Sequence, residues 1–358
     1  MKFKIPKKVA IPAILLLLAA CGLLAAYLKY EPSRHFRGTD IPVLATPEQI
    51  GGVGVSDTEE AVNGDTTSFG LTGVKDNETA GKVSAANPSS AEIRGARGSF
   101  NLLLLATDAR AEEASRTDVL MLAHVNPEDN TVNLVSIPRD TRVHLPGIGL
   151  TKINHAHAMA EASGKGSHAG TLAAIQAVSN LCRCTINYYI KTNFSGFEHF
   201  IDTIGGIDVK LEAPVKLTYN DRTLPAGEQH WDGETALNFV RERKSLEDGD
   251  NARQRNQALV LQAIARKLLV PDNLTRLPEL IRQVKEDILD TNLTDTDMLS
   301  LAWMVRSIDP EEMYFVQFPG SSGKAKDPLV GAELYYWIPD MTAWSEISRQ
   351  LLGDEIDE

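Results

Sequence analysis

Three short segments near residue 100 have the hydrophobic pattern of β-strands. Residues 100–105 form a nearly continuous apolar run, which is typical of a strand buried on both faces of a sheet. Residues 118–125 and 131–137 are also dominated by β-branched and other apolar residues, and the polar stretch 126–130 between them has the composition of a hairpin turn. The folded part of the chain is therefore expected to begin near Ser99 with a sheet.

Beyond Pro138 the pattern changes to helices that alternate with strands. Apolar positions three and four apart predict helices at residues 171–181, 197–204, 234–240, 253–269, 277–288 and 296–308. Further strands are predicted at residues 186–191, 207–211 and 313–318. Because helices are available for both faces of a sheet with mixed pairing, the predicted fold class is α/β: a three-layer α/β/α sandwich with a central mixed sheet.

The N-terminus combines a basic segment with a long apolar one. Four lysines within residues 1–9 precede an uncharged run over residues 10–28, which is long enough to cross a hydrocarbon core of about 30 Å as a helix. The positive-inside rule then leaves the basic segment in the cytoplasm. This pattern predicts a single-pass protein of the cytoplasmic membrane, with its main domain extracytoplasmic, on the periplasmic or cell-wall side.

Two other interpretations of the same residues remain open. Ala19-Ala20 is a small-residue pair of the kind found at signal-peptide cleavage sites, and Cys21 after Leu18-Ala19-Ala20 resembles a lipidation site. The apolar run continues past Cys21 to Leu28, which favours a retained helix. All three interpretations place the body of the protein beyond the membrane.

The predicted domain organisation follows from these patterns. Residues 29–97 are rich in small and acidic residues, so they are expected to form a flexible extracytoplasmic linker. The expected parts are a cytoplasmic basic segment at 1–9, a transmembrane anchor at 10–28, the linker at 29–97, a folded domain at 98–320 and a C-terminal extension at 321–358.

Composition restricts the possible ligands. Hydrophobic residues make up 43% of the 358 residues, as in an ordinary globular protein, and the formal net charge is −12. A general attraction to nucleic acid is therefore excluded, and an anionic ligand requires a local cluster of arginines and lysines. Cys182 and Cys184 form either a small, strained disulfide ring or two half-buried thiols, and the spacing favours the thiols.

Several motifs of candidate chemistry follow one another along the folded part. They are LLLATDAR at 103–110, RTD at 116–118, SIPRDT at 136–141, KINHA at 152–156, YYIKTNF at 188–194, IGGIDV at 204–209 and FVRER at 239–243, followed by Asp250, Arg253 and Gln257. In this order they resemble the LytR–CpsA–Psr family over roughly residues 98–320, which makes that range the catalytic domain.

The residues themselves fit phosphate chemistry. Asp108 and Asp118 lie at the ends of adjacent predicted strands, where two carboxylates can share Mg²⁺ or Mn²⁺; the other interpretation is turn capping or pairing with an arginine. Guanidinium groups bind phosphate bidentately, and Arg139, Arg241 and Arg243 lie at element ends. Arg241 and Arg243 would point the same way if the backbone becomes extended there.

The resemblance implies a function for these positions. In the family the counterparts of seven residues surround the pyrophosphate of a polyprenyl-linked glycan: Asp108, Asp118, Arg139, Arg241, Arg243, Arg253 and Gln257. The implied reaction is attack by a peptidoglycan hydroxyl on the sugar-proximal phosphorus, with polyprenyl phosphate leaving. Either Asp108 or Asp140 would accept the hydroxyl proton, and Lys152 is a further candidate for a phosphate contact.

This chain departs from the family pattern at two positions, and the place of the lipid and the type of function stay open. Ala106 replaces the glycine common before the first Thr-Asp of the family, and Asn256 stands where a second arginine is common. The carrier lipid requires an apolar groove, and Phe194, Phe197 and Phe200 are candidates to line it, but their helical spacing is more typical of plain core. Two rival functions use the same residues: a polyprenyl-pyrophosphate hydrolase, and a non-enzymatic lipid-pyrophosphate or wall-polymer binding regulator of envelope assembly.

Overall fold

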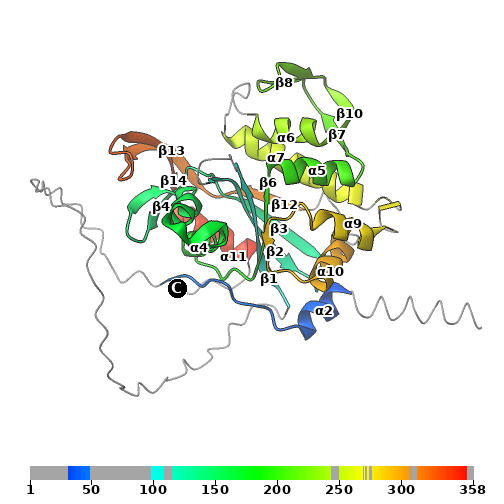
Figure 1. The fold of residues 1–358 in the computed structure, drawn as a ribbon, viewed down its shortest axis with the longest axis horizontal. Helices are drawn as coiled ribbons and strands as arrows, with labels where there is room; N and C mark the ends of the chain where they lie inside the picture. The colour runs from blue at the N-terminus through cyan, green and yellow to red at the C-terminus, as the bar shows by residue number, and fades with distance from the viewer. Residues whose placement is uncertain are drawn as a thin grey trace, which may run out of the picture. The chain divides into compact units, whose positions relative to one another are not determined.

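Six strands form the central sheet, in the order β11-β6-β1-β2-β3-β12 (Figure 1). The computed structural model describes residues 31–48, 98–108, 115–242, 250–268, 270, 272–273, 276–305, 308 and 313–352, with the backbone alone at 250–255, 277 and 305. The strands are β1 (Phe100–Thr107), β2 (Thr117–Asn126), β3 (Thr131–Ser136), β6 (Tyr188–Asn193), β11 (Asp290–Thr291) and β12 (Tyr314–Gln317).

The pairing of these strands is mixed, as expected. β2 runs antiparallel to β1 and β3, whereas β6 pairs parallel with β1 and β12 pairs parallel with β3. The β2–β3 connection is a hairpin in which Asn130 adopts a φ of 52°, a left-handed conformation that asparagine tolerates better than most residues. Helices pack on both faces, so the predicted mixed α/β fold with a central sheet is confirmed.

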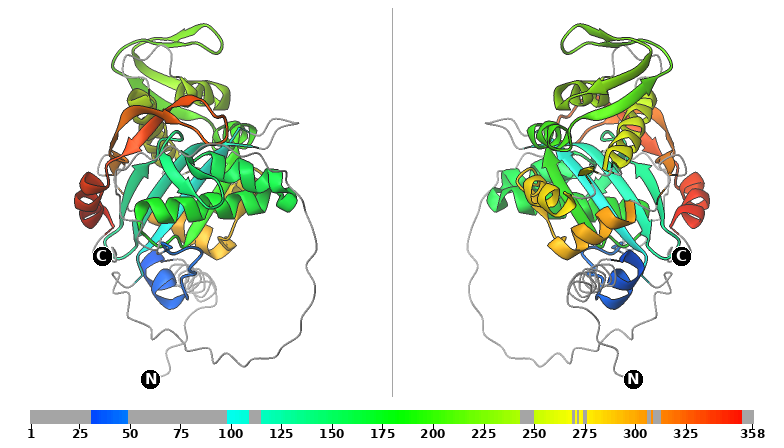
Figure 2. Two further views of the ribbon diagram at one scale, coloured as in Figure 1. Left: turned by 90° about the vertical axis from the view of Figure 1, so that its left-hand side faces the viewer. Right: turned by 90° about the vertical axis from the view of Figure 1, so that its right-hand side faces the viewer.

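Helices cover both faces of the sheet (Figure 2), and alternate residues of the strands face the two helical layers. Leu103, Leu105 and Leu122 pack with helices α3 (His155–Ala160), α4 (Gly166–Cys182) and α11 (Met341–Leu351). Leu102 and Met121 belong to the opposite cluster, which includes residues of α2 (Pro32–Gly38), α9 (Leu277–Val284) and α10 (Asp295–Val305). Burying each such side chain contributes about 1.5–3 kcal/mol, which explains why the strands are apolar on both sides.

A second cluster of helices and short strands lies beside the carboxyl end of β6. It comprises α5 (Phe194–Thr203), α6 (Gly233–Arg241), α7 (Asp250–Leu268), β7 (Ile207–Leu211), β8 (Val215–Leu217), β9 (Arg222–Leu224) and β10 (Gly227–Trp231). β7 pairs antiparallel with β10, whose side chains pack through Trp231 against Phe239 at 4.7 Å between ring centroids. The strands β8 to β10 were not predicted, because none has more than five residues and the segment that contains them is mostly polar.

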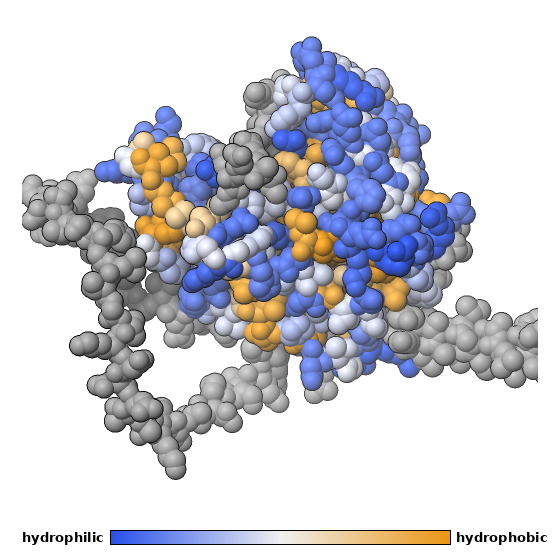
Figure 3. Space-filling model, viewed as in Figure 1, coloured by the Kyte–Doolittle hydropathy of each residue, from blue (hydrophilic) through white to orange (hydrophobic). Residues whose placement is uncertain are grey.

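Two two-stranded sheets and a π-helical turn complete the described chain. β4 (Arg142–Leu145) pairs with β5 (Gly149–Lys152), and β13 (Gly320–Lys326) pairs with β14 (Glu333–Pro339). A π-helical turn, Glu161–Lys165, joins α3 to α4. Figure 3 shows apolar side chains gathered over the β13–β14 hairpin, which carries the exposed Leu329 and Val330.

The prediction of a flexible linker over residues 29–97 is wrong for residues 31–47, which pack against the domain. Phe36 of α2 is 1% exposed, with its ring 4.5 Å from that of Phe100. His35 bonds to Asp297 of α10, and Ala45 forms a bridge with Ile186. This segment has no periodic hydrophobic pattern, because its burial comes from contacts with residues far along the chain. The rest of the predicted linker, residues 49–97, lies outside the described residues.

This packing makes Phe36 part of the core. Replacing Phe36 by alanine should lower the free energy of unfolding by about 3–5 kcal/mol, because it removes a buried ring from a well-packed cluster. Urea unfolding measures the effect, with Val43→Ala as the control because Val43 is 62% exposed. Equal stability of the two variants would show that the segment does not contribute to the fold.

The C-terminal extension is also an integral part of the domain, so the predicted boundary at residue 320 is corrected. Trp344 of α11 stacks on Phe318 at 4.5 Å, and its indole N–H donates to the carbonyl oxygen of Cys182. The backbone N–H of Trp337 donates to the carbonyl oxygen of Asp140, so β14 is hydrogen-bonded to the loop that follows β3. Cys182 and Cys184 are both buried and carry free thiols.

A fully buried carboxylate ties the β13–β14 hairpin to β5. Asp327 accepts hydrogen bonds from the Tyr336 hydroxyl at 2.6 Å and the Thr151 hydroxyl at 2.8 Å, and from the backbone N–H groups of Leu329 and Val330. Burial alone would raise the pKa of Asp327, but these four hydrogen bonds outweigh it and lower the pKa to about 2.

The depressed pKa of Asp327 predicts an acid-sensitive contribution to stability. The contribution is present above the unfolded pKa of about 4 and is lost as the pH falls toward 2, and it amounts to about 2 kcal/mol. Urea unfolding between pH 5 and pH 2 should therefore show a smaller loss for Asp327→Asn than for the wild type, and the exposed Asp40→Asn should match the wild type. A parallel decline in all three proteins would refute this role.

Among the residues that the structure describes, no helix is both long and apolar enough to cross a membrane. The predicted anchor at 10–28 lies outside the described residues, as do residues 353–358 of the C-terminal extension.

Candidate active site

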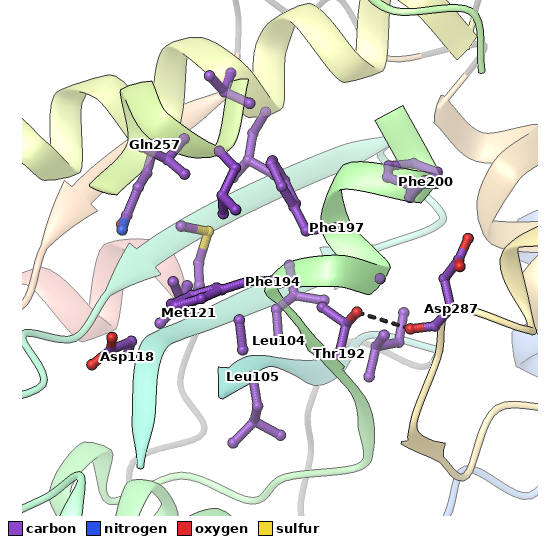
Figure 4. A pocket seen from close by; sticks show the side chains of 18 of the residues that line it. Leu104, Leu105, Asp118, Met121, Thr192, Phe194, Phe197, Phe200, Gln257 and Asp287 are labelled. Atoms are coloured by element: carbon purple, nitrogen blue, oxygen red, sulfur yellow. Dashed lines mark hydrogen bonds between the residues drawn. The ribbon is translucent and has the colours of Figure 1, made fainter. Parts of the chain in front are cut away.

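An apolar cavity of about 340 Å³ lies between the sheet and the helices α5, α6, α7 and α9. Its walls are built mainly from aliphatic and aromatic side chains: Leu104, Leu105, Val119, Met121, Ile190, Phe194, Phe197, Phe200, Leu237, Val240, Val260, Leu261, Ile264, Val284 and Ile288. Asp118, Arg139, Arg241 and Gln257 also line it. Figure 4 shows Asp118 and Gln257 on one side of the cavity and Asp287 on the other, with the phenylalanines between them.

The strand-to-helix junction at Asn193 shapes one wall of this cavity. The Asn193 side chain accepts a hydrogen bond from the backbone N–H of Gly196 at 2.8 Å, which caps α5 at the end of β6. Gly196 is required there, since a Cβ would lie 2.5 Å from the carbonyl oxygen of Asp287. The cap therefore starts α5 against the sheet, and Phe194, Phe197 and Phe200 line the cavity along its length. Both interpretations of this spacing therefore apply: all three side chains line the cavity, and Phe197 and Phe200 also pack against the hydrophobic cluster beside β6.

The polar end of the cavity contains a chain of ion pairs. Arg139, in the loop after β3, donates to Asp118 of β2, and its Nε lies 3.8 Å from Asp140 Oδ2. Asp140 is 6% exposed and accepts from Lys152 Nζ at 2.7 Å. Asp140 and Lys152 are not among the residues that line the cavity. The arrangement holds the Arg139 guanidinium at the cavity, while Asp140 and Lys152 support it from behind.

Asp108 directly follows β1 at the same corner of the sheet. Its backbone N–H donates to the carbonyl oxygen of Arg116, and its carboxylate accepts from the backbone N–H of Arg116 at 3.0 Å. The antiparallel pairing of β1 and β2 places Asp108 and Asp118 at one corner of the sheet. The contacts that they make there, with the Arg116 backbone and with Arg139, are those of the alternative interpretation without a metal ion. In the described part of the chain no group of three or more His, Cys, Asp or Glu residues is arranged to hold a metal ion.

Two carboxylates at one corner are nevertheless suitable ligands for a Mg²⁺ or Mn²⁺ ion that binds together with the substrate. Such a cation usually keeps several waters and takes one or two protein carboxylates together with substrate phosphates, rather than a complete protein cage. The described hydrogen bonds of Asp108 and Asp118 each use Oδ1. The donor set is therefore suited to a cation that phosphate oxygens complete.

A buried network fixes the start of β2 behind this corner. The His157 Nδ1–H donates to the carbonyl oxygen of Ser115 at 2.8 Å, and its Nε2 accepts from Lys191 Nζ at 2.7 Å. Glu161 accepts from both the N–H and the hydroxyl of Ser115. Burial and the neighbouring Lys191 lower the pKa of His157, so its imidazole is neutral and can accept from the ammonium. These bonds hold Ser115 three residues before Asp118.

The structure brings together most of the predicted site residues. Asp118, Arg139, Arg241 and Gln257 line one cavity although they come from β2, the loop after β3, α6 and α7. The backbone becomes extended at Glu242, with φ −63° and ψ 133°, which is the extended one of the two alternatives considered for Arg241 and Arg243. Arg243 and the side chain of Arg253 lie outside the described residues. Sequence reasoning missed Tyr219, which lines the cavity from a turn that carries no motif.

This combination of fold and site defines the class of protein. Residues 63–352 match the model of the LytR_cpsA_psr family, so the chain belongs to that family and is an enzyme of the transferase class.

Individual relatives share this class. The chain is 33% identical over 243 residues to the polyisoprenyl-teichoic acid–peptidoglycan teichoic acid transferase TagU of Bacillus anthracis, covering 67% of this chain and 74% of that protein. It is 30% identical over 256 residues to TagU of Bacillus subtilis strain 168, covering 70% and 76%.

Solved structures agree with the fold. The crystal structure of B. subtilis TagV matches with a TM-score of 0.61 and 27% identity, covering 72% of this chain and 97% of that one. A structure of TagT bound to LI-WTA matches with a TM-score of 0.57 and 26% identity, covering 72% and 90%.

Proposed function

We propose that this enzyme moves a glycopolymer from a polyprenyl-pyrophosphate carrier to a hydroxyl of peptidoglycan and releases polyprenyl phosphate. The observation that carries the proposal is the cavity: a long apolar wall suits a prenyl chain, and its polar end presents Arg139 and Arg241 to a diphosphate. The names of the TagU relatives support a polyisoprenyl-linked polymer and a peptidoglycan acceptor.

The proposed reaction is a phosphoryl transfer. The acceptor oxygen forms a bond to the sugar-proximal phosphorus, and the bond from that phosphorus to the bridging oxygen breaks. The bridging oxygen leaves with polyprenyl phosphate, so the polymer becomes linked to the wall by a phosphodiester. Charge increases on the equatorial and leaving oxygens during this step, and preorganised guanidinium groups stabilise that charge.

The contacts of the site residues suggest separate roles for them. We assign binding of the pyrophosphate to Arg139, Arg241 and Gln257. We assign the same role to Arg243, which lies outside the described residues, and to Arg253, of which only the backbone is described. Asp108 and Asp118 would hold Mg²⁺ or Mn²⁺, which supplies positive charge to the phosphate oxygens when bound. Asp140 is buried and held by Lys152, so we assign both to the positioning of Arg139. This leaves Asp108 as the candidate acceptor of the hydroxyl proton.

The proposal includes a membrane location. The predicted anchor ends at Leu28, and α2 begins at Pro32 and packs against the domain. A carrier lipid in the same membrane would therefore be within reach of the domain without a long tether between them.

The test uses the full chain in detergent with a polyprenyl-pyrophosphate-linked oligosaccharide and Mg²⁺, and follows polyprenyl phosphate with and without peptidoglycan fragments. Release that requires the fragments supports the transferase. Equal release without an acceptor would instead identify a hydrolase, and tight binding without any release would identify a binding regulator.

A further inference from the structure

The guanidinium of Arg241 lies between two aromatic rings. Its central carbon is 4.3 Å from the ring centroid of Phe194 and 4.4 Å from that of Tyr219. All three side chains line the apolar cavity. Both rings are within the distance at which a cation is attracted to an aromatic ring.

The two rings come from separate elements. Phe194 is the first residue of α5 and is fixed by the Asn193 cap. Tyr219 belongs to the turn between β8 and β9, and it is 56% exposed. An exposed tyrosine at a turn has no core to hold it, so its place over Arg241 requires another cause.

That cause is the residue that follows Arg241. Glu242 is fully buried, and its carboxylate accepts from the backbone N–H of Thr218 at 2.5 Å and from the Thr218 hydroxyl at 3.0 Å. Thr218 directly precedes Tyr219. The end of α6 therefore holds the β8–β9 turn, and the turn in return places a ring on Arg241.

Stacking of this kind suits an arginine that must bind phosphate. A guanidinium bonds to phosphate through N–H groups in its own plane, while its two faces can pack on aromatic rings. Packing on two rings reduces the freedom of a long side chain, which otherwise costs up to about 2 kcal/mol to order. A guanidinium held in this way keeps its in-plane N–H groups for phosphate.

We propose that Tyr219 is a positioning residue for Arg241, and that the β8–β9 turn, held by Glu242, sets the affinity of the site for a prenyl-linked pyrophosphate. The proposal rests on the proposed function, because it takes Arg241 as a pyrophosphate ligand. Tyr219 acts through its ring face and not through its hydroxyl.

The experiment compares the full chain in detergent with its Tyr219→Leu and Tyr219→Phe variants by calorimetry, using farnesyl pyrophosphate and farnesol as probes. Tyr219→Leu should raise the Kd for farnesyl pyrophosphate by about 2- to 5-fold, the effect of one cation–π contact at an exposed site. Tyr219→Phe should bind like the wild type, and farnesol should bind all three proteins equally. The matched control is Tyr314→Leu, because Tyr314 is 54% exposed and lies outside the cavity.

The outcomes separate this inference from the proposed function. If the wild type does not bind farnesyl pyrophosphate more tightly than farnesol, the proposed function itself fails. If the wild type does so and Tyr219→Leu is unchanged, Tyr219 does not position Arg241. An equal loss for farnesol would show that Tyr219 is only a cavity wall, and a loss in Tyr219→Phe would show that its hydroxyl is the active group. Thermal unfolding of each variant identifies any loss of fold, and Glu242→Gln, which weakens the hold on Thr218, should then reproduce the loss seen with Tyr219→Leu.

Discussion

Replacing Arg139 by alanine should lower the rate of glycopolymer transfer by about 10²–10³-fold, the usual cost of removing one preorganised group that stabilises transition-state charge. Arg139 is the cation that bonds directly to Asp118 and lines the polar end of the cavity. Its loss also leaves the Asp118 carboxylate without that guanidinium. Acceptor-dependent release of polyprenyl phosphate under single-turnover conditions measures the change.

The control for Arg139 is Arg282→Ala, because Arg282 is 64% exposed on α9 and pairs with Glu279 of the same helix. This variant should keep wild-type turnover. Arg139→Lys should recover only part of the activity, since an ammonium retains the charge without the bidentate geometry. Full activity of Arg139→Ala would remove this residue from the chemistry and would contradict the assignment of the polar end of the cavity.

Replacing Leu104 by tryptophan should raise the KM for a long-chain polyprenyl donor by about 10- to 100-fold. Leu104 is only partly buried and lines the cavity from β1, so the larger ring fills space that the prenyl chain is proposed to occupy. Overpacking of this kind costs about 1–3 kcal/mol, and here the bound lipid bears the cost.

A short-chain donor separates this effect from a general loss of activity. A donor with a much shorter prenyl chain should be affected less by Leu104→Trp, and the melting temperature of the variant should stay close to that of the wild type, because the ring enters an existing cavity. An equal rise in KM for long and short donors would show that the apolar wall does not bind the prenyl chain.

The sheet and the site corner were predictable because their signals are local. The residues of β1 are apolar on both sides since both faces of the strand are buried, and the polar stretch at 126–130 marks the β2–β3 hairpin. Asp108 directly follows the first of these strands and Asp118 lies at the start of the next, so antiparallel pairing predicts their proximity. The arginines were found by their motifs, and the fold then places Arg139 and Arg241 at one cavity.

The parts that were not predictable depend on contacts between distant segments. Phe36 is buried by Phe100 and Tyr188, and nothing in its own neighbourhood indicates this. The helical spacing of Phe197 and Phe200 is the same for a filled core and for a cavity wall, and only the position of α5 distinguishes the two. Tyr219 contacts Arg241 through a turn that Glu242 holds, a relation that spacing along the chain does not reveal.

The most direct test of the account is mass spectrometry of both products from one reaction of the full chain with a polyprenyl-pyrophosphate-linked oligosaccharide and peptidoglycan fragments. We expect a phosphodiester between sugar and peptidoglycan, together with polyprenyl monophosphate in equal amount. Polyprenyl pyrophosphate and a sugar joined to peptidoglycan without phosphorus would contradict it, because that result would show glycosyl transfer instead of phosphoryl transfer.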